Sequence, residues 1–246
     1  MFELSTTNFI LAFVAAFILG VSKAGLKGVA IVIMTIMALV FGSKASTGIV
    51  MPLLLVGDLF AIIYYRKHVQ KKHLFKLIPW MLLGVLIGVY VGKDIPENLF
   101  KKGMAGIILI SVILMFWWDY RKSSAVPTHP VFGINMGLSA GFATMIGNLA
   151  GAFTNLYFLA MRLPKNSFIG TAAWLYFFVN WFKVPFHVFS WETINIESLK
   201  VSLFLIPAEI LGLVIGVKIV KLIRDKHYRI FILALTAIGA IVLFFR

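Results

Sequence analysis

The fold of this 246-residue chain is decided by Gly20-Val-Ser22-Lys23-Ala-Gly25-Leu-Lys27-Gly28 and by a second stretch, Gly141-Phe-Ala-Thr144-Met-Ile-Gly147-Asn148-Leu-Ala-Gly151. Each stretch divides an apolar run into a pair of segments, 8–21 with 29–42 and 131–146 with 149–161. These segments hold about 13 to 16 residues, or about 20 to 24 Å of helix, whereas a bilayer core is about 30 Å thick. The sequence leaves open whether each pair crosses the membrane fully or is re-entrant. Short, glycine-interrupted segments at matching places in two halves indicate a transporter binding site at the membrane midplane.

The composition around these breaks is that of a membrane protein. Hydrophobic residues make up 61% of the chain and charged residues 13%, whereas an average soluble domain is about half apolar and about a quarter charged. An ordinary cytosolic enzyme is therefore excluded. The net charge of +14 would suit a nucleic-acid partner only if basic and aromatic residues shared one solvated surface. No domain is free to offer such a surface, so we expect the lipid bilayer and a small anion as partners, and no nucleic acid.

Nothing in the sequence indicates a cofactor, a metal site or a catalytic centre. There is no cysteine, which excludes a disulfide framework and thiolate ligands. The five histidines lack the spacing of metal ligands. HExxH, GxSxG and phosphate-loop motifs are also missing, so an intramembrane enzyme is disfavoured.

The predicted fold is an all-α polytopic membrane protein with about ten hydrophobic segments. Besides the four short ones, the segments cover 45–65, 74–92, 100–118, 167–189, 199–220 and 228–245. Assigning the connections to alternate sides puts 15 basic residues on one side and 6 on the other. Basic connections stay in the cytoplasm, which predicts that the loop from Arg66 to His73 is cytoplasmic and that both termini face outward.

An internal match at an offset of 128 residues divides the chain into halves 1–123 and 124–246. Ile78-Pro79, Gly84 and Gly88 return with identical spacing as Ile206-Pro207, Gly212 and Gly216, and Gly42-Ser43-x-Ala45 returns as Gly170-Thr171-x-Ala173. Each half holds one short pair and three long spans, and an odd number of long spans inverts the second half. Inverted repeats are a transporter architecture. The alternative is that Pro-x4-Gly-x3-Gly is a common packing pattern of membrane helices.

The two breaks supply the candidate anion-binding groups. Helices that begin near Gly28 and Gly151 would point unpaired N–H groups and a partial positive charge at the breaks, and such helix ends bind anions. Lys23 and Lys27 would add full charges, unless they extend to the cytoplasmic interface. The substrate-binding candidates of the breaks are Ser22, Lys23, Gly25, Lys27, Gly28, Thr144, Gly147, Asn148 and Gly151.

Ionisable residues within the long spans are few, and each is a candidate for function. A carboxyl group buried away from water is favoured in its neutral form, which makes Asp58 and Glu209 candidates for proton coupling, with a structural hydrogen bond as the alternative for Glu209. Lys183 lies near the outer end of its span, so we do not expect a direct pair between Asp58 and Lys183. Lys183, Asn180 and Thr171 are further substrate-binding candidates, although polar side chains of this kind also hold helices together.

Taken in order, these motifs resemble the sulfite exporter TauE/SafE family over nearly the whole chain. The motifs of the first half are Gly20-x-Ser22-Lys23-x-Gly25-x-x-Gly28, Pro52 to Asp58-x-x-Ala61, and Tyr65-Arg66-x-His68. Those of the second half are Gly141-Phe-x-Thr144-Met-x-x-Asn148-x-x-Gly151, Phe168-Ile-Gly170-Thr171, and Asn180-x-x-Lys183-Val-Pro185. The first break departs from the family's glycine run and following proline, since Ala24 and Lys27 stand there, a difference that bears on the substrate. The resemblance implies a multi-pass protein of the bacterial inner membrane that exports sulfite or small organosulfur anions.

The predicted function is a secondary transporter that exports a small anion, sulfite or an organosulfonate, by alternating access between the two repeats. An interior-negative potential favours expulsion of an anion by about 2.3 kcal/mol per charge per 100 mV. The alternatives are an anion channel, an importer of a small carboxylate or sulfur-containing anion, and a membrane scaffold. The sequence does not decide whether copies of the chain associate as a homo-oligomer.

Overall fold

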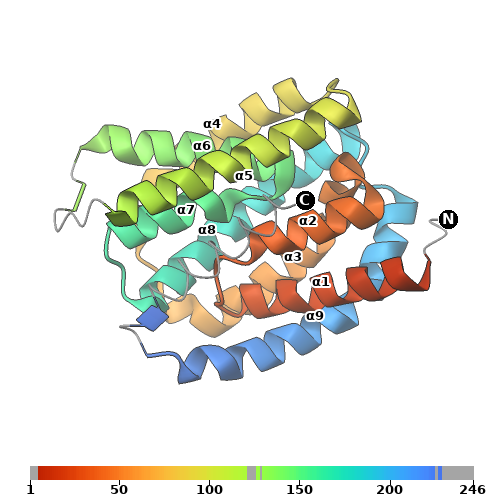
Figure 1. Cartoon of the computed structure of the whole chain (residues 1–246). Coiled ribbons are helices and arrows are strands. Elements are labelled where there is room, and N and C mark those ends of the chain that lie inside the picture. The colour runs from red at the N-terminus through yellow and green to blue at the C-terminus, as the bar shows by residue number, and fades with distance from the viewer. Residues whose placement is uncertain (1–4, 121–125, 128, 225–226, 229–246) are drawn as a thin grey trace.

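The computed structural model describes residues 5–120, 126–127, 129–224 and 227–228, and this part of the chain is all-helical, as predicted (Figure 1). The described residues form nine α-helices, and two of the connections between them contain a 3₁₀ turn (η1) and a π turn (η2). The elements are α1 (Thr6–Lys23), α2 (Ala30–Phe41), α3 (Ser43–Tyr65), η1 (Arg66–His68), α4 (Lys71–Gly92), α5 (Glu97–Tyr120), α6 (Pro130–Gly147), α7 (Ala150–Ala160), α8 (Lys165–Pro185), η2 (Phe186–Ser190) and α9 (Ile196–Leu222).

Two of the four segments predicted to be short are longer than expected. α1 and α6 each have 18 residues, whereas α2 has 12 and α7 has 11. α1 continues through Gly20 to Lys23, and its N-terminus is capped by the Ser5 side chain, which accepts from the Asn8 N–H. Each pair is therefore one helix of spanning length followed by one half-length helix. The tenth predicted segment, 228–245, lies outside the described residues except for Tyr228.

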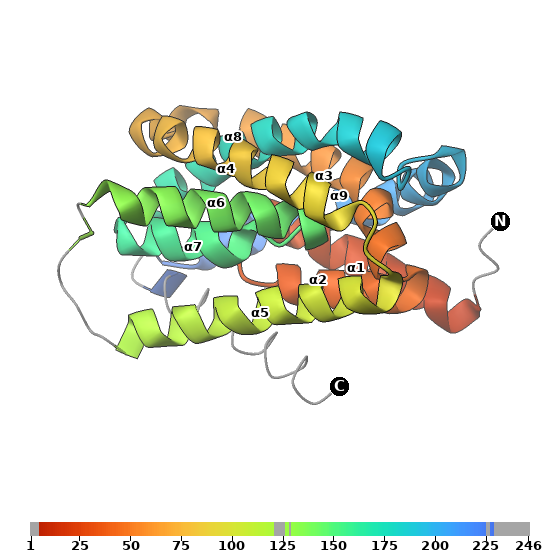
Figure 2. The same ribbon diagram turned by 90° about the horizontal axis from the view of Figure 1, so that it is seen from above.

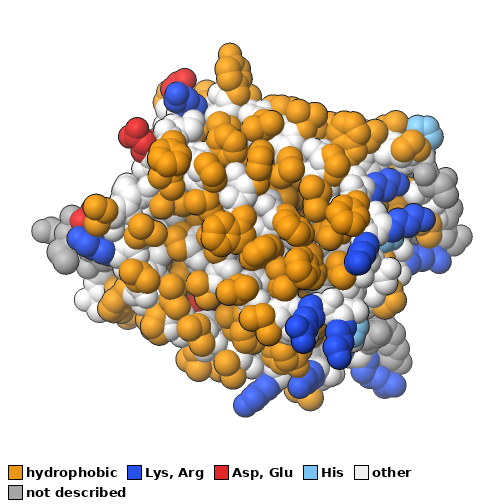
Figure 3. All heavy atoms as spheres, turned by 180° about the vertical axis from the view of Figure 1, so that it is seen from behind, with side chains coloured by type: hydrophobic (Ala, Val, Ile, Leu, Met, Phe, Trp, Pro, Cys, Tyr) orange, Lys and Arg blue, Asp and Glu red, His pale blue; other side chains and the backbone are white. Residues whose placement is uncertain are grey.

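The surface is that of a membrane protein. Five of the described helices, α1, α3, α4, α6 and α9, are long and apolar enough to cross a bilayer. Large hydrophobic side chains are exposed along them, for example Leu83, Ile87 and Tyr90 on α4 and Leu211 on α9. Figure 3 shows a broad hydrophobic surface with Lys and Arg side chains gathered at one end. The apolar area is far larger than a soluble protein exposes, so these faces contact lipid.

The helices of the two halves exchange partners. α1 packs along α9 and α6 packs along α4, while α3 and α8 pack against each other and against α9 and α4 respectively (Figures 1 and 2). Glycines allow the close approach: Gly84 of α4 lies against the backbone of Leu138, and Gly212 of α9 lies against the backbone of Phe17. A Cβ atom at either glycine would come within 2.2 Å of a carbonyl oxygen. The glycines that sequence matching paired thus have the same role in both halves.

Another part of the sequence match is wrong. Gly42 lies between α2 and α3 with a φ of 88°, whereas Gly170 lies inside α8. Gly170 instead corresponds to Gly48 of α3, since each lies against the backbone of the connection that follows the partner helix. Gly48 meets Thr193 and Gly170 meets Tyr65. These two contacts lie at opposite ends of the central pair α3 and α8.

Candidate functional site

The two breaks have different backbone geometry. α1 ends at Lys23, and the chain reaches α2 through Gly25 and Gly28, whose φ angles of 129° and 108° are unfavourable for residues with a side chain. α6 ends at Gly147, and Asn148 adopts the left-handed conformation with a φ of 55° before α7 begins. Neither α2 nor α7 has a side-chain cap, so the first N–H groups of both half-length helices are free of such partners.

A cavity of about 60 Å³ lies between the breaks and α8. A water molecule needs about 10 to 15 Å³ by this measure, so the cavity has room for about four to six water molecules. Its apolar wall includes Leu19, Ile33, Met34 and Leu54. The polar side chains that line it are Ser22, Lys23, Lys27, Thr144, Asn148, Asn155, Tyr176 and Asn180.

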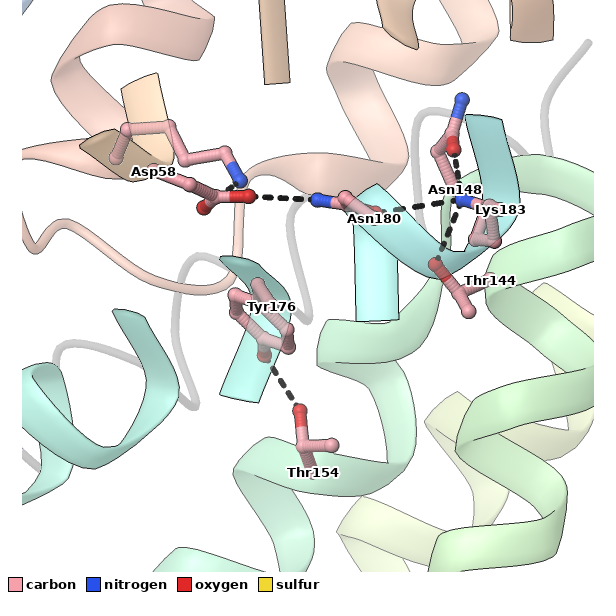
Figure 4. A network of polar contacts seen from close by, with 8 residues as sticks. Asp58, Thr144, Asn148, Thr154, Tyr176, Asn180 and Lys183 are labelled. Atoms are coloured by element: carbon pink, nitrogen blue, oxygen red, sulfur yellow. Dashed lines mark hydrogen bonds and ion pairs between the residues drawn. The ribbon is translucent and has the colours of Figure 1, made fainter. Parts of the chain in front are cut away.

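A polar network runs from Lys23 along one side of the cavity (Figure 4). Lys23 Nζ donates to Asp58 Oδ1 at 2.5 Å, and Asn180 Nδ2 donates to Asp58 Oδ2 at 2.7 Å. Lys183 Nζ in turn donates to Asn180 Oδ1 at 3.4 Å and to Asn148 Oδ1 at 2.6 Å. Asn180 therefore links Asp58 to Lys183, and the Lys23 charge is balanced by a carboxylate.

Lys27 lies on the cavity wall outside this network. Its side chain is buried, and among the described residues its Nζ has no hydrogen bond or ion pair; it lies 5.5 Å from the centre of the Tyr176 ring. Asn155 Oδ1, also buried, accepts no hydrogen bond from the residues described. A buried ammonium group needs a partner, so the cavity offers one positive charge that an anion can satisfy.

The structure brings most of the sequence candidates together. Ser22, Lys23, Lys27, Gly28, Thr144, Asn148, Gly151 and Asn180 line the cavity. Gly25 and Gly147 shape the breaks beside it. Thr171 is not among the lining residues, because its hydroxyl accepts from the Gln70 N–H at the η1 end of α8.

Lys183 lies in the last turn of α8, as expected, but it is not among the residues that line the cavity. It is fully buried, and its Nζ donates to Asn148 and to Thr144 Oγ1. No direct contact joins it to Asp58 among the described residues, as expected, but Asn180 bridges the two. The two proton-coupling candidates, Asp58 and Glu209, lie behind Lys23, where Glu209 Oε1 faces Gly57 of α3.

Two polar lining residues were missed by sequence reasoning, Asn155 and Tyr176. Both could have been found from helical spacing, because Asn155 lies four residues after Gly151 and Tyr176 lies four before Asn180. Residues four apart share a helix face. The Tyr176 hydroxyl is held 2.5 Å from Thr154 Oγ1, which fixes the ring beside both lysines of the first break.

Comparison with known proteins gives one match. The family model described as "Sulfite exporter TauE/SafE" matches residues 9–243. No curated protein and no solved structure matches the chain.

Proposed function

Because the chain belongs to the sulfite exporter TauE/SafE family, we propose that it carries sulfite or a small organosulfonate out of the cell through the cavity between the two breaks. Membership confirms the resemblance read from the sequence and makes the chain a membrane protein of a transporter family. The observation that carries the proposal is Lys27, a buried ammonium group on the wall of a small cavity with no acidic partner among the described residues.

The cavity suits a small oxyanion in size and in charge. It has room for about four to six water molecules, a space that fits a small oxyanion such as sulfite. Lys27 supplies the charge, and the uncapped first turns of α2 and α7 supply N–H groups and a partial positive charge. Thr144 and Asn148, from the second break, add neutral polar groups to the lining. Lys23 contributes little net charge, since Asp58 balances it.

Alternating access by two inverted repeats is supported by the lining of the cavity. α1 and α6 run in opposite directions (Figures 1 and 2). Lining residues from the two halves also pair at a constant separation of 121 residues: Lys23 with Thr144, Lys27 with Asn148, Ala30 with Gly151, and Met34 with Asn155. A cavity built from equivalent positions lies at the interface of the repeats, where rocking of one against the other exposes it to either side.

The test measures the Tm of the purified protein with and without added anions. It compares the wild type with Lys27→Gln and with a matched control, Lys102→Gln, on the exposed face of α5. A ligand that binds only the folded state raises apparent stability, so sulfite and methanesulfonate are expected to raise the Tm of the wild type and of Lys102→Gln. Loss of the charged contact in Lys27→Gln weakens binding about tenfold to a hundredfold.

Transport itself is tested by exchange in proteoliposomes. A carrier exchanges labelled sulfite against unlabelled sulfite with saturable kinetics. If neither sulfite nor a sulfonate stabilises the wild type, or if Lys27→Gln binds as tightly as the control, the proposed site is wrong. Ohmic single-channel currents without saturable exchange would make the protein a channel.

A further inference from the structure

Glu209 is a buried ionisable group close to the cavity that the proposed anion site does not use. It lies in the middle of α9 and its side chain is fully buried. Neither carboxyl oxygen accepts a hydrogen bond from the residues that the structure describes. An ionised carboxylate is very costly to bury without donors, so the arrangement fits a carboxyl group that carries a proton.

The surroundings of Glu209 contain one amino group and a second carboxyl group. A methyl group at Gly57 would lie 2.7 Å from Glu209 Oε1 and 2.6 Å from Lys23 Cγ, so the two side chains meet over this glycine. Lys23 donates in this state to Asp58. α9 packs against α1 and α3. The Lys, Asp and Glu residues of these two helices are Lys23, Lys44 and Asp58, and Lys44 lies at the far end of α3. The Lys23 side chain thus lies near two carboxyl groups and donates to one of them, Asp58.

The other half of the molecule shows that helix packing does not require the carboxyl group. Gly20 of α1 lies against the backbone of Glu209, and Gly141 of α6 lies in the same way against the backbone of Met81. Met81 and Glu209 are 128 residues apart, as are the glycine pairs of α4 and α9. An apolar side chain therefore serves at the equivalent position, and the carboxyl group of Glu209 has a purpose other than packing.

We propose that Glu209 is a proton-binding site that controls anion binding in the cavity, with Lys23 moving between Asp58 and Glu209 as the proton leaves and returns; this rests on the proposed anion site. With the proton on Glu209, the three side chains carry no net charge and Lys23 stays with Asp58. When the O–H bond breaks and the proton passes to water, the group of three carries one negative charge, and the new carboxylate competes for Lys23.

The consequence for the cavity follows from charge. A negative charge beside Lys27 weakens its attraction for an anion, so proton release at Glu209 lowers anion affinity, and by linkage anion binding favours proton uptake. Withdrawal of Lys23 also frees Asp58, whose other oxygen accepts from Asn180. Asn180 in turn contacts Lys183, so release of the proton would change hydrogen bonds across the interface of α3 and α8.

The experiment measures methanesulfonate affinity at acidic and alkaline pH in the wild type, Glu209→Gln and Glu209→Met, with Glu197→Gln in the exposed first turn of α9 as the matched control. Methanesulfonate keeps its charge over this range, so a change reports the protein. Wild type and control are expected to bind about fivefold to a hundredfold more weakly at alkaline pH. Both Glu209 variants should bind at both pH values as the wild type does at acidic pH. The proposal would be overturned if the wild type bound methanesulfonate equally well at both pH values, or if Glu209→Gln kept the pH dependence of the wild type.

A second measurement separates this proposal from the proposed function. Infrared difference spectra between acidic and alkaline buffer should show the C=O band of a protonated carboxylic acid in the wild type, and the band should be missing in Glu209→Gln. If no anion binds at any pH but this band is present and specific to Glu209, the transport proposal fails and the proton site stands. A spectrum of Glu209→Gln identical to that of the wild type removes the proton site whatever the binding data show.

Discussion

The break after α1 and the break after α6 each join an 18-residue helix to a half-length helix, but they have different chemistry. The first contains both lysines and needs glycine at two backbone positions. The second is shorter, contains no charge, and turns at Asn148, which donates through Nδ2 to the Thr47 carbonyl. The first break supplies positive charge to the cavity and the second supplies neutral polar groups.

Because of this difference, the two halves contribute different chemical groups to the cavity. A symmetric pair of breaks would present the same groups from both halves, whereas here Lys27 of the first break and Asn148 of the second, 121 residues apart, both line the cavity. In the proposed site, the positive charge for an anion therefore comes from the first break and the neutral hydrogen-bonding groups come from the second. Lys183 and Lys27 also differ in their hydrogen bonds. Lys183 Nζ donates to three acceptors, whereas Lys27 Nζ has none among the described residues.

The largest effect on stability is expected at the carboxylate that holds the first break in place. Asp58→Ala leaves the buried Lys23 without its partner, and breaking a buried ion pair in this way costs about 3 to 5 kcal/mol. Asn180, which lies 122 residues later on the helix that packs against α3, is the comparison. Asn180→Ala removes uncharged hydrogen-bonding groups and should cost about 1 to 3 kcal/mol. Thermal unfolding in detergent measures both, and equal losses would contradict the ion pair as the main anchor of this region.

The sequence predicted the position of this region but not its contacts. The glycine breaks, the burial of Asp58 and Glu209, and the matching positions of Gly84 and Gly212 could be read from composition and spacing. The partner of Asp58 could not, because Lys23 was assigned to a loop and lies in fact on the last turn of α1. Which side chains of distant helices meet depends on their rotation and close approach, and neither is encoded in the hydrophobic pattern.

The repeat offset illustrates the same limit. Matching identical residues found an offset of 128 for α4 and α9, and the matched glycines Gly84 and Gly212 each lie against the backbone of a partner helix. The offset is 121 for the lining residues of α1 and α6 and 122 for Gly48 and Gly170. Loops of unequal length change the offset along the chain. For this reason the pairing of Gly42 with Gly170 was wrong, and Asn155 was missed although its partner Met34 also lines the cavity.

A smaller effect is expected at the turn of the second break. Asn148→Ala removes the shortest hydrogen bond of Lys183 and the donor to Thr47, and leaving such groups unsatisfied costs about 1 to 3 kcal/mol. Asn155→Ala is the matched control on α7, since Asn155 Oδ1 has no partner among the described residues, and its unfolding temperature should change less. If the two variants unfold alike, Asn148 does not anchor Lys183.

The smallest effect is expected for alanine substitutions of glycine. These substitutions test whether only the first break needs a backbone conformation that favours glycine. Gly25 has a φ of 129°, and a Cβ atom there would lie 2.8 Å from Ile169 Cδ1. Gly25→Ala is therefore expected to cost about 1 to 2 kcal/mol of unfolding free energy. Gly151 lies in the first turn of α7, and its nearest contact to an added Cβ would be 3.5 Å.

Gly151→Ala should be neutral or stabilise the protein by about 0.5 to 1 kcal/mol, because alanine loses less conformational freedom in a helix than glycine does. Unfolding temperatures in detergent compare the two variants directly. A loss at Gly151 as large as that at Gly25 would mean that the second break also needs close backbone approach. The turn at Asn148 alone would then be insufficient to account for the geometry of the second break, and the two breaks would be more alike than their sequences suggest.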